Sequence, residues 1–202
     1  MDWFIGFLLT IFRPALGLII LAGLLLFWIL QKKLPKEKFL KLILYFFSIV
    51  IIFQSVFSTI LNWWLWSQQG FTQQLLPPHS PISYILKYSW QHYWFESIIT
   101  IVTAVIVFFG IYFLNKKFEK NLFYNEEKYL AALGVLSVGW PNCLIFLCLV
   151  LFLGVALHLI SFLFNKGRNR LALLYLWIPC ALLILLLNDI INKYIGINEF
   201  II

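Results

Sequence analysis

Long apolar segments alternate with short polar connectors along most of the chain. Segments suited to crossing a bilayer cover residues 14–31, 39–66, 95–114, 143–164 and 171–187, and a shorter one covers 129–138. A helix needs about 20 apolar residues to cross the hydrocarbon core, and the first segment, which starts at Pro14, is just long enough. The pattern predicts an all-α, polytopic membrane bundle of about six transmembrane segments, one of them short, with 1–202 as a single membrane domain.

Three stretches interrupt or precede this pattern. Residues 3–12 are apolar but too short to cross, so we expect an interfacial helix or an extension of the first span. Residues 67–94 are rich in Gln and Pro, which predicts a polar outer loop with a short interfacial helix at 82–94. The sequence Gly-Trp-Pro-Asn at 139–142 is typical of a turn, and divides 129–164 into a short helix and a full span.

Charge gives the predicted bundle an orientation. Twelve of the fifteen Lys and Arg residues fall in three connectors, 31–41, 115–128 and 166–170. Cytoplasmic loops carry such an excess, so these connectors are expected inside and the N-terminus outside, provided that 129–138 crosses the membrane. We therefore expect a multi-pass protein of a bacterial or archaeal cytoplasmic membrane. The tryptophans favour this orientation as an outer aromatic belt, with an aromatic platform for a substrate as the alternative; they are Trp63, Trp64, Trp66, Trp90, Trp94 and Trp140.

Composition excludes a soluble protein. Hydrophobic residues make up 63% of the chain and charged residues 11%, far from the usual balance of a globular domain. The net charge of +7 is explained by the three basic connectors, and there is no basic stripe of the kind that binds nucleic acid. The expected partners are the lipid bilayer and other membrane proteins. The sequence leaves the oligomeric state open.

Few ionisable residues stand outside the connectors. His158 lies in the middle of the segment 143–164, where it either packs structurally or serves a function. His92 and Glu96 are four residues apart, which makes them a surface pair or half of a metal or acid/base site. The scattered histidines lack the spacing of a metal motif, so we predict no metal and no cofactor. The glutamates near the basic connectors are interpreted as solvated loop charges; they are Glu37, Glu119, Glu126 and Glu127.

The stretch from residue 123 resembles the core of the type IV prepilin and preflagellin peptidases, which are membrane aspartic peptidases. Residues 128–134 (KYLAALG) are similar to the family's KLxAALG, and 139–142 match its break before a long helix. A small-residue patch at 153–156, the basic connector 166–170 and Leu34-Pro35 also correspond to family features. The resemblance covers about 14–190 and is most specific over 128–170. It implies a helical membrane core and a place in pilus or secretion-type processing or assembly.

The departures from this family fall on its catalytic residues. Aspartic catalysis needs two carboxylates close together, one acting as base and one as acid. The position of the first family aspartate is occupied by Trp28, and that of the second by Glu126. We therefore expect a catalytically degenerate, peptidase-like protein that binds or assembles prepilin-like or other membrane proteins.

Two other interpretations stay open. In the first, Glu126 and a neighbour such as Glu37 or Glu127 form a displaced carboxylate pair that keeps peptidase activity. In the second, the chain is the membrane subunit of a small-molecule transporter or an assembly factor. A transporter is expected to place polar residues near the midplane, and the candidates are His158, Ser161 and Ser48.

Overall fold

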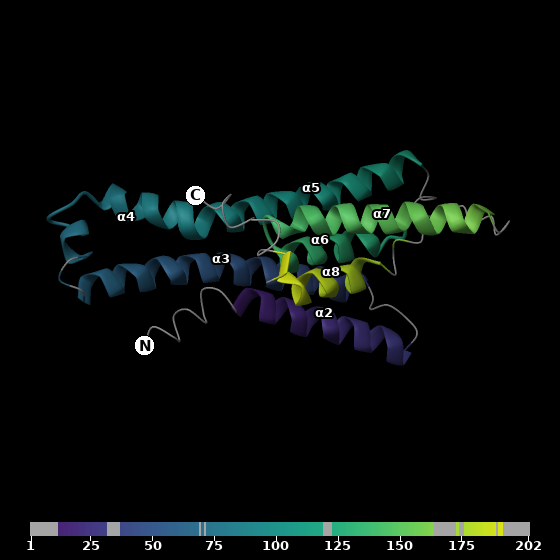
Figure 1. The fold of residues 1–202 in the computed structure, drawn as a ribbon, viewed down its shortest axis with the longest axis horizontal. Helices are drawn as coiled ribbons and strands as arrows, with labels where there is room; N and C mark the ends of the chain where they lie inside the picture. The colour runs from purple at the N-terminus through teal and green to yellow at the C-terminus, as the bar shows by residue number, and fades with distance from the viewer. Residues whose placement is uncertain are drawn as a thin grey trace.

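The computed structural model describes residues 12–31, 37–68, 70, 72–118, 123–163, 173, 176–188 and 190–191. The side chains of 12–14, 27–31 and 161–162 lie outside this description. Within the described residues every regular element is helical (Figure 1). In chain order these elements are α2 (Phe12–Gln31), α3 (Glu37–Gln68), η2 (Thr72–Leu75), α4 (Ile82–Ser89), η3 (Trp90–Trp94), α5 (Phe95–Lys117), α6 (Glu127–Val138), α7 (Asn142–Leu163) and α8 (Trp177–Leu186).

The predicted all-α architecture is confirmed for the described residues. Three helices are long and apolar enough to cross a membrane: Glu37–Gln68, Ile82–Lys117 and Asn142–Ile160. Most of each apolar stretch lies on the surface of the molecule, with only 17–22% of it buried. A surface of this kind is stable in contact with lipid and unfavourable in contact with water.

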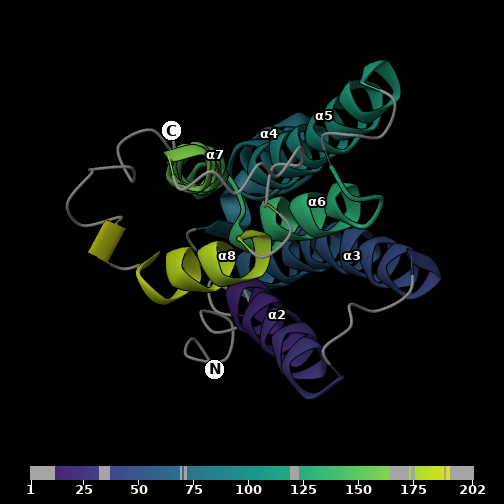
Figure 2. The same ribbon diagram turned by 90° about the vertical axis from the view of Figure 1, so that its right-hand side faces the viewer.

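Helix α6 forms the centre of the bundle. It contacts α2, α3, α5, α7 and α8, and residues 129–137 are all buried. Viewed from one end, α6 lies between α3 and α5, with α8 on its other side (Figure 2). A helix that is apolar on every side is buried on every side, and the small residues Ala131, Ala132 and Gly134 let its neighbours approach closely.

The break between α6 and α7 occurs where the sequence predicts it. Gly139 has a φ of 78°, a left-handed conformation that glycine adopts without steric cost. Its N–H donates to the carbonyl of Val135 at 3.0 Å, which ends α6. The N–H of Trp140 donates to Oγ1 of Thr100 at 2.9 Å, so the turn is fixed to α5.

Several ends of helices meet at one end of the bundle. The C-terminal ends of α2, α5 and α7 and the N-terminal ends of α3 and α6 lie toward the right side of Figure 1. The described parts of two basic connectors, 37–41 and 115–128 with a gap at 119–122, therefore share one end of the molecule. The third connector, 166–170, and the segment 3–12 lie outside the described residues.

Two predicted elements differ from the structure. The segment 171–187 was expected to form a full span, but α8 has only ten residues. Pro179 lacks an N–H and fits a helix only in its first turn, so the helix begins just before it, at Trp177. The helix expected at 82–94 is not a separate interfacial element. It has no Gly or Pro after residue 81, and it continues through a π-helical turn at Trp90–Trp94 directly into α5.

The close contact between α6 and α7 gives a direct test of this packing. A Cβ atom on Gly134 would lie 2.5 Å from Cζ and 2.9 Å from Cε1 of the buried Phe146 ring. Gly134→Ala is expected to lower the free energy of unfolding by about 1–2 kcal/mol, because overpacking outweighs the gain in helix propensity. Thermal unfolding in detergent measures the change. The matched control is Gly110→Ala in α5, where a Cβ would meet nothing within 4 Å. An equal effect of both variants would contradict the packing.

Candidate functional site

The candidate site lies at the N-terminal end of α6, at the end of the bundle that carries the basic connectors. Glu126, Glu127, Lys128 and Tyr129 follow one another there. Successive residues of a helix point about 100° apart, so these side chains contact different neighbours. One group of contacts is formed around the Glu127 carboxyl and a second around the Glu37 carboxyl.

Glu127 is completely buried, with no exposed side-chain surface. Its Oε1 accepts a hydrogen bond from the backbone N–H of Tyr124 at 3.2 Å, and its Oε2 accepts one from Nε1 of Trp177 at 3.4 Å. Burial raises the pKa of the Glu127 carboxyl to about 7; the two hydrogen bonds act in the opposite direction, and the nearby charge of Glu126 adds a small increase. The carboxyl is therefore poised between its acid and its ionised form near neutral pH.

The indole of Trp177 positions this carboxyl. Trp177 is the first residue of α8 and is itself buried, and its ring packs against Phe146 of α7 with ring centroids 5.9 Å apart. The side chain of Glu127 is thus held at the junction of α6, α7 and α8. A buried carboxylate costs free energy unless it is hydrogen-bonded, and here each carboxyl oxygen accepts a hydrogen bond.

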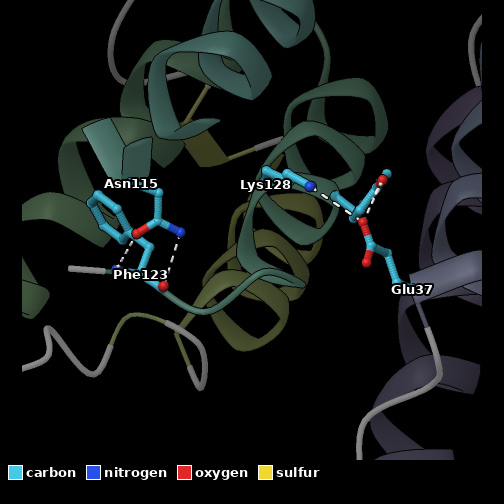
Figure 3. Close-up of polar contacts among 5 residues, drawn as sticks. Glu37, Asn115, Phe123 and Lys128 are labelled. Carbon is cyan, nitrogen blue, oxygen red and sulfur yellow. Dashed lines mark hydrogen bonds and ion pairs between the residues drawn. The ribbon is translucent and has the colours of Figure 1, made fainter. Parts of the chain in front are cut away.

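Glu37 joins the N-terminal end of α3 to α6 (Figure 3). Its Oε1 lies 3.2 Å from Nζ of Lys128 and accepts a hydrogen bond from the hydroxyl of Tyr129 at 2.9 Å. The ammonium group of Lys128 also lies over the rings of Tyr129, Tyr112 and Phe108, at 5.0–5.9 Å from their centroids. The hydrogen bond from Tyr129 and the ion pair with Lys128, both made to Oε1, lower the pKa of the Glu37 carboxyl, whose side chain remains about half exposed.

Asn115 holds the chain that enters the site. Its Nδ2 donates to the carbonyl of Phe123 at 2.9 Å, and its Oδ1 accepts from the N–H of Phe123 at 2.9 Å (Figure 3). Both residues are buried. The amide therefore closes the connection between α5 and α6 and fixes the backbone just before Tyr124, whose N–H binds Glu127.

The structure places the expected catalytic positions as follows. Glu126 is the N-cap residue of α6, and its carbonyl accepts from the N–H groups of Tyr129 and Leu130. Its side chain is half-buried, and its charge is felt by Glu127. Residue 28 belongs to α2, and the side chain of Trp28 lies outside the described residues.

The other polar candidates lie away from this site. His158 is exposed on α7, so it is not packed in the interior. His92 is exposed in the π-turn, with its ring 4.2 Å from that of Tyr88, and Glu96 is half-buried in the first turn of α5. Within the described part of the chain, no three His, Cys, Asp or Glu side chains are grouped so as to hold a metal ion.

Sequence reasoning missed the buried carboxyl. Glu127 was interpreted as a solvated charge because it stands in a polar connector beside Glu126 and Lys128. Helical spacing could not have identified it, because residues 129–137 are all buried and the same spacing would equally mark Lys128, which is only partly buried. The positioning roles of Trp177 and Asn115 were missed as well, and only the fold brings them to α6.

The comparisons with known proteins give this chain no family. No family model, no curated protein and no solved structure matches it.

Proposed function

We propose that this chain is a polytopic protein of a bacterial or archaeal cytoplasmic membrane with a prepilin-peptidase-like core that has lost peptidase activity and serves in assembly. It crosses the bilayer six times, with the N-terminus outside and the basic connectors in the cytoplasm. The observation that carries the proposal is the short α6, buried at Glu127 and from residue 129 to 137, which begins at an acidic pair at the basic end and terminates at the Gly-Trp-Pro break.

The placement of α2 supports the kinship. A Cβ on Gly17 would lie 3.1 Å from Cβ of Ser137, so α2 and α6 touch there, and they run in opposite directions (Figure 1). Residue 28 is eleven positions beyond Gly17, and residue 126 is eleven positions before Ser137. Each of these eleven-residue separations corresponds to about 16 Å along its helix, and both lead toward the same end of the bundle. The backbones of residues 28 and 126, which correspond to the family aspartates, are thus at a similar height along the bundle.

The chemistry of the site supports loss of activity. An indole at position 28 can serve neither as acid nor as base. Glu37 is engaged by Lys128 and Tyr129, and Glu127 is enclosed by Tyr124 and Trp177. A carboxylate that activates water for attack on a peptide must reach both the water and the substrate.

A cleavage assay tests the loss of activity. The full chain, reconstituted with a prepilin-type substrate, is expected to give no cleavage above the background of empty liposomes, while a competent peptidase in the same vesicles cleaves. Purification from native membranes in mild detergent tests the assembly role: components of a pilus or secretion inner-membrane platform are expected to co-purify. Substrate cleavage by the chain would contradict the proposal.

A displaced carboxylate pair is the second candidate function. It is favoured by the adjacency of Glu126 and Glu127, because aspartic catalysis uses two neighbouring carboxyls and the pKa of Glu127 is raised, mainly by burial and least by Glu126. In that case the chain cleaves the substrate, and Glu126→Gln and Glu127→Gln each abolish cleavage. Cleavage that is unchanged in Glu126→Gln, or absent from the parent chain, removes this candidate.

A further inference from the structure

A narrow apolar groove runs between α3 and α5 at the basic end of the bundle. Its volume is about 340 Å³, and α6 forms its floor with Ala132 and Leu136. Tyr45 and Phe109 stand on its two sides, and both are about half exposed. Figure 2 shows α6 between the two outer helices. The groove is thus a gap in the outer layer of the bundle that reaches the central helix.

The dimensions of the groove limit what can occupy it. Its lining extends from residue 41 to 48 on α3 and from 129 to 136 on α6, a length of about 11 Å. The groove therefore spans only about two helical turns, a short seat for a partner helix. One hydrocarbon chain fits, and the surrounding surface of α3 and α5 is apolar, as contact with lipid requires.

The charges at the mouth of the groove favour an anionic head group. Lys41 lines the groove, and Lys38 precedes it by one turn on the same face of α3. The neighbouring carboxylate, Glu37, forms its ion pair with Lys128; its charge also acts on Lys41, whose ammonium group lies 5.8 Å from the centroid of the Tyr45 ring. Lys38 and Lys41 are both exposed at the end of an apolar channel, and they lie at the end of the bundle assigned to the cytoplasmic leaflet, where anionic lipids are recognised by such lysines.

We propose that the α3/α5 groove is a binding site for one anionic phospholipid, with an acyl chain between α3 and α5 and the phosphate on Lys38 and Lys41. The site depends on membrane embedding and is independent of the peptidase kinship. The lipid would fill the outer layer of the bundle between α3 and α5, above the floor that α6 forms.

Native mass spectrometry of the full, delipidated chain in detergent tests the site with two lipids that share their acyl chains, phosphatidylglycerol and phosphatidylcholine. The parent chain is expected to bind one phosphatidylglycerol more tightly than phosphatidylcholine. Lys41→Gln should lower the affinity for phosphatidylglycerol about fivefold, and Lys38→Gln with Lys41→Gln about 25-fold, with little change for phosphatidylcholine. Lys87→Gln in α4 is the matched control, because it removes the same charge at the opposite end.

Variants that fill the groove test the acyl-chain contact independently of the lysine charges. Val105→Trp changes a half-exposed position on the side of the groove, and Ser48→Leu is a second filling variant. The Ser48 hydroxyl donates only to the carbonyl of Leu44 in its own helix, so its loss breaks no contact between helices. Both variants should weaken both lipids.

Three outcomes overturn the proposal. The first is a preference for phosphatidylglycerol that survives in the double lysine variant. The second is lipid binding that is unchanged by both filling variants. The third is that the filling variants abolish self-association of the chain while lipid binding stays unchanged. A second copy of the chain would then be the occupant of the groove. Recovery of the chain outside the membrane fraction would instead contradict the membrane embedding on which both proposals depend.

Discussion

Glu127→Gln is expected to raise the stability of the protein at pH 8 and to remove most of its dependence on pH. The carboxyl has an ordinary pKa of 4.5, and burial raises it to about 7 in the folded chain. The folded state therefore holds the proton more tightly than the unfolded state, and stability falls as pH rises from about 4.5 through 7. The full loss amounts to about 3 kcal/mol, and a glutamine, which stays neutral, avoids it. Its amide nitrogen cannot accept, so the variant gives up one accepted hydrogen bond, the weaker being that from Trp177 at 3.4 Å, which offsets part of the gain.

Thermal unfolding followed by tryptophan fluorescence between pH 5 and pH 8 measures this effect. The unfolding temperature of the parent chain should fall with rising pH, while that of Glu127→Gln should change little. Glu126→Gln is the control, because the charge of Glu126 is the smallest contribution to the shift, so most of the slope should remain. A slope in Glu127→Gln equal to that of the parent would show that another group is responsible.

Asn115→Ala is expected to lower the free energy of unfolding by about 2–4 kcal/mol. The substitution removes two hydrogen bonds of 2.9 Å and leaves the N–H and the carbonyl of Phe123 without a partner in a buried position. Because Phe123 precedes Tyr124, the backbone donor to Glu127 also loses its support. Chemical denaturation in mixed micelles measures the loss.

Two variants define the role of the amide. Asn115→Asp keeps the acceptor for the N–H of Phe123 and loses the donor to its carbonyl, so an intermediate loss is expected. Asn125→Ala changes an exposed residue of the neighbouring turn, and its effect should stay within about 0.5 kcal/mol. If Asn115→Ala behaves like Asn125→Ala, the amide contributes nothing to the connection between α5 and α6.

Much of the fold follows from local pattern alone. The apolar segments predict α3, α5 and α7 to within a few residues, because long apolar runs have no stable alternative to a helix in lipid. The short α6 and its end at Gly139 also follow from the sequence, since glycine and proline interrupt a helix in predictable ways. The shortness of α8 could have been anticipated from Pro179.

The site depends on contacts that no local pattern contains. Glu127 receives a hydrogen bond from Trp177, fifty positions later, and Glu37 meets Tyr129 from ninety-two positions earlier. Charges in a connector are indistinguishable in sequence until packing decides which of them is enclosed. The acidic pair at 126–127 shows this clearly, because one carboxyl is half-buried and its neighbour is completely buried.

The uninterrupted helix Ile82–Lys117 has 36 residues and a length of about 54 Å, well beyond the hydrocarbon thickness of about 30 Å. Its neighbour α3 has 32 residues and is about 48 Å long, and the two lie side by side over part of their length (Figure 1). The indole N–H of Trp94 donates to the hydroxyl of Thr59 between them at 3.1 Å. Under the topology proposed above, the two helices would extend beyond the hydrocarbon core on the side opposite the basic connectors. Their far ends would then stand at a set height above the lipid surface.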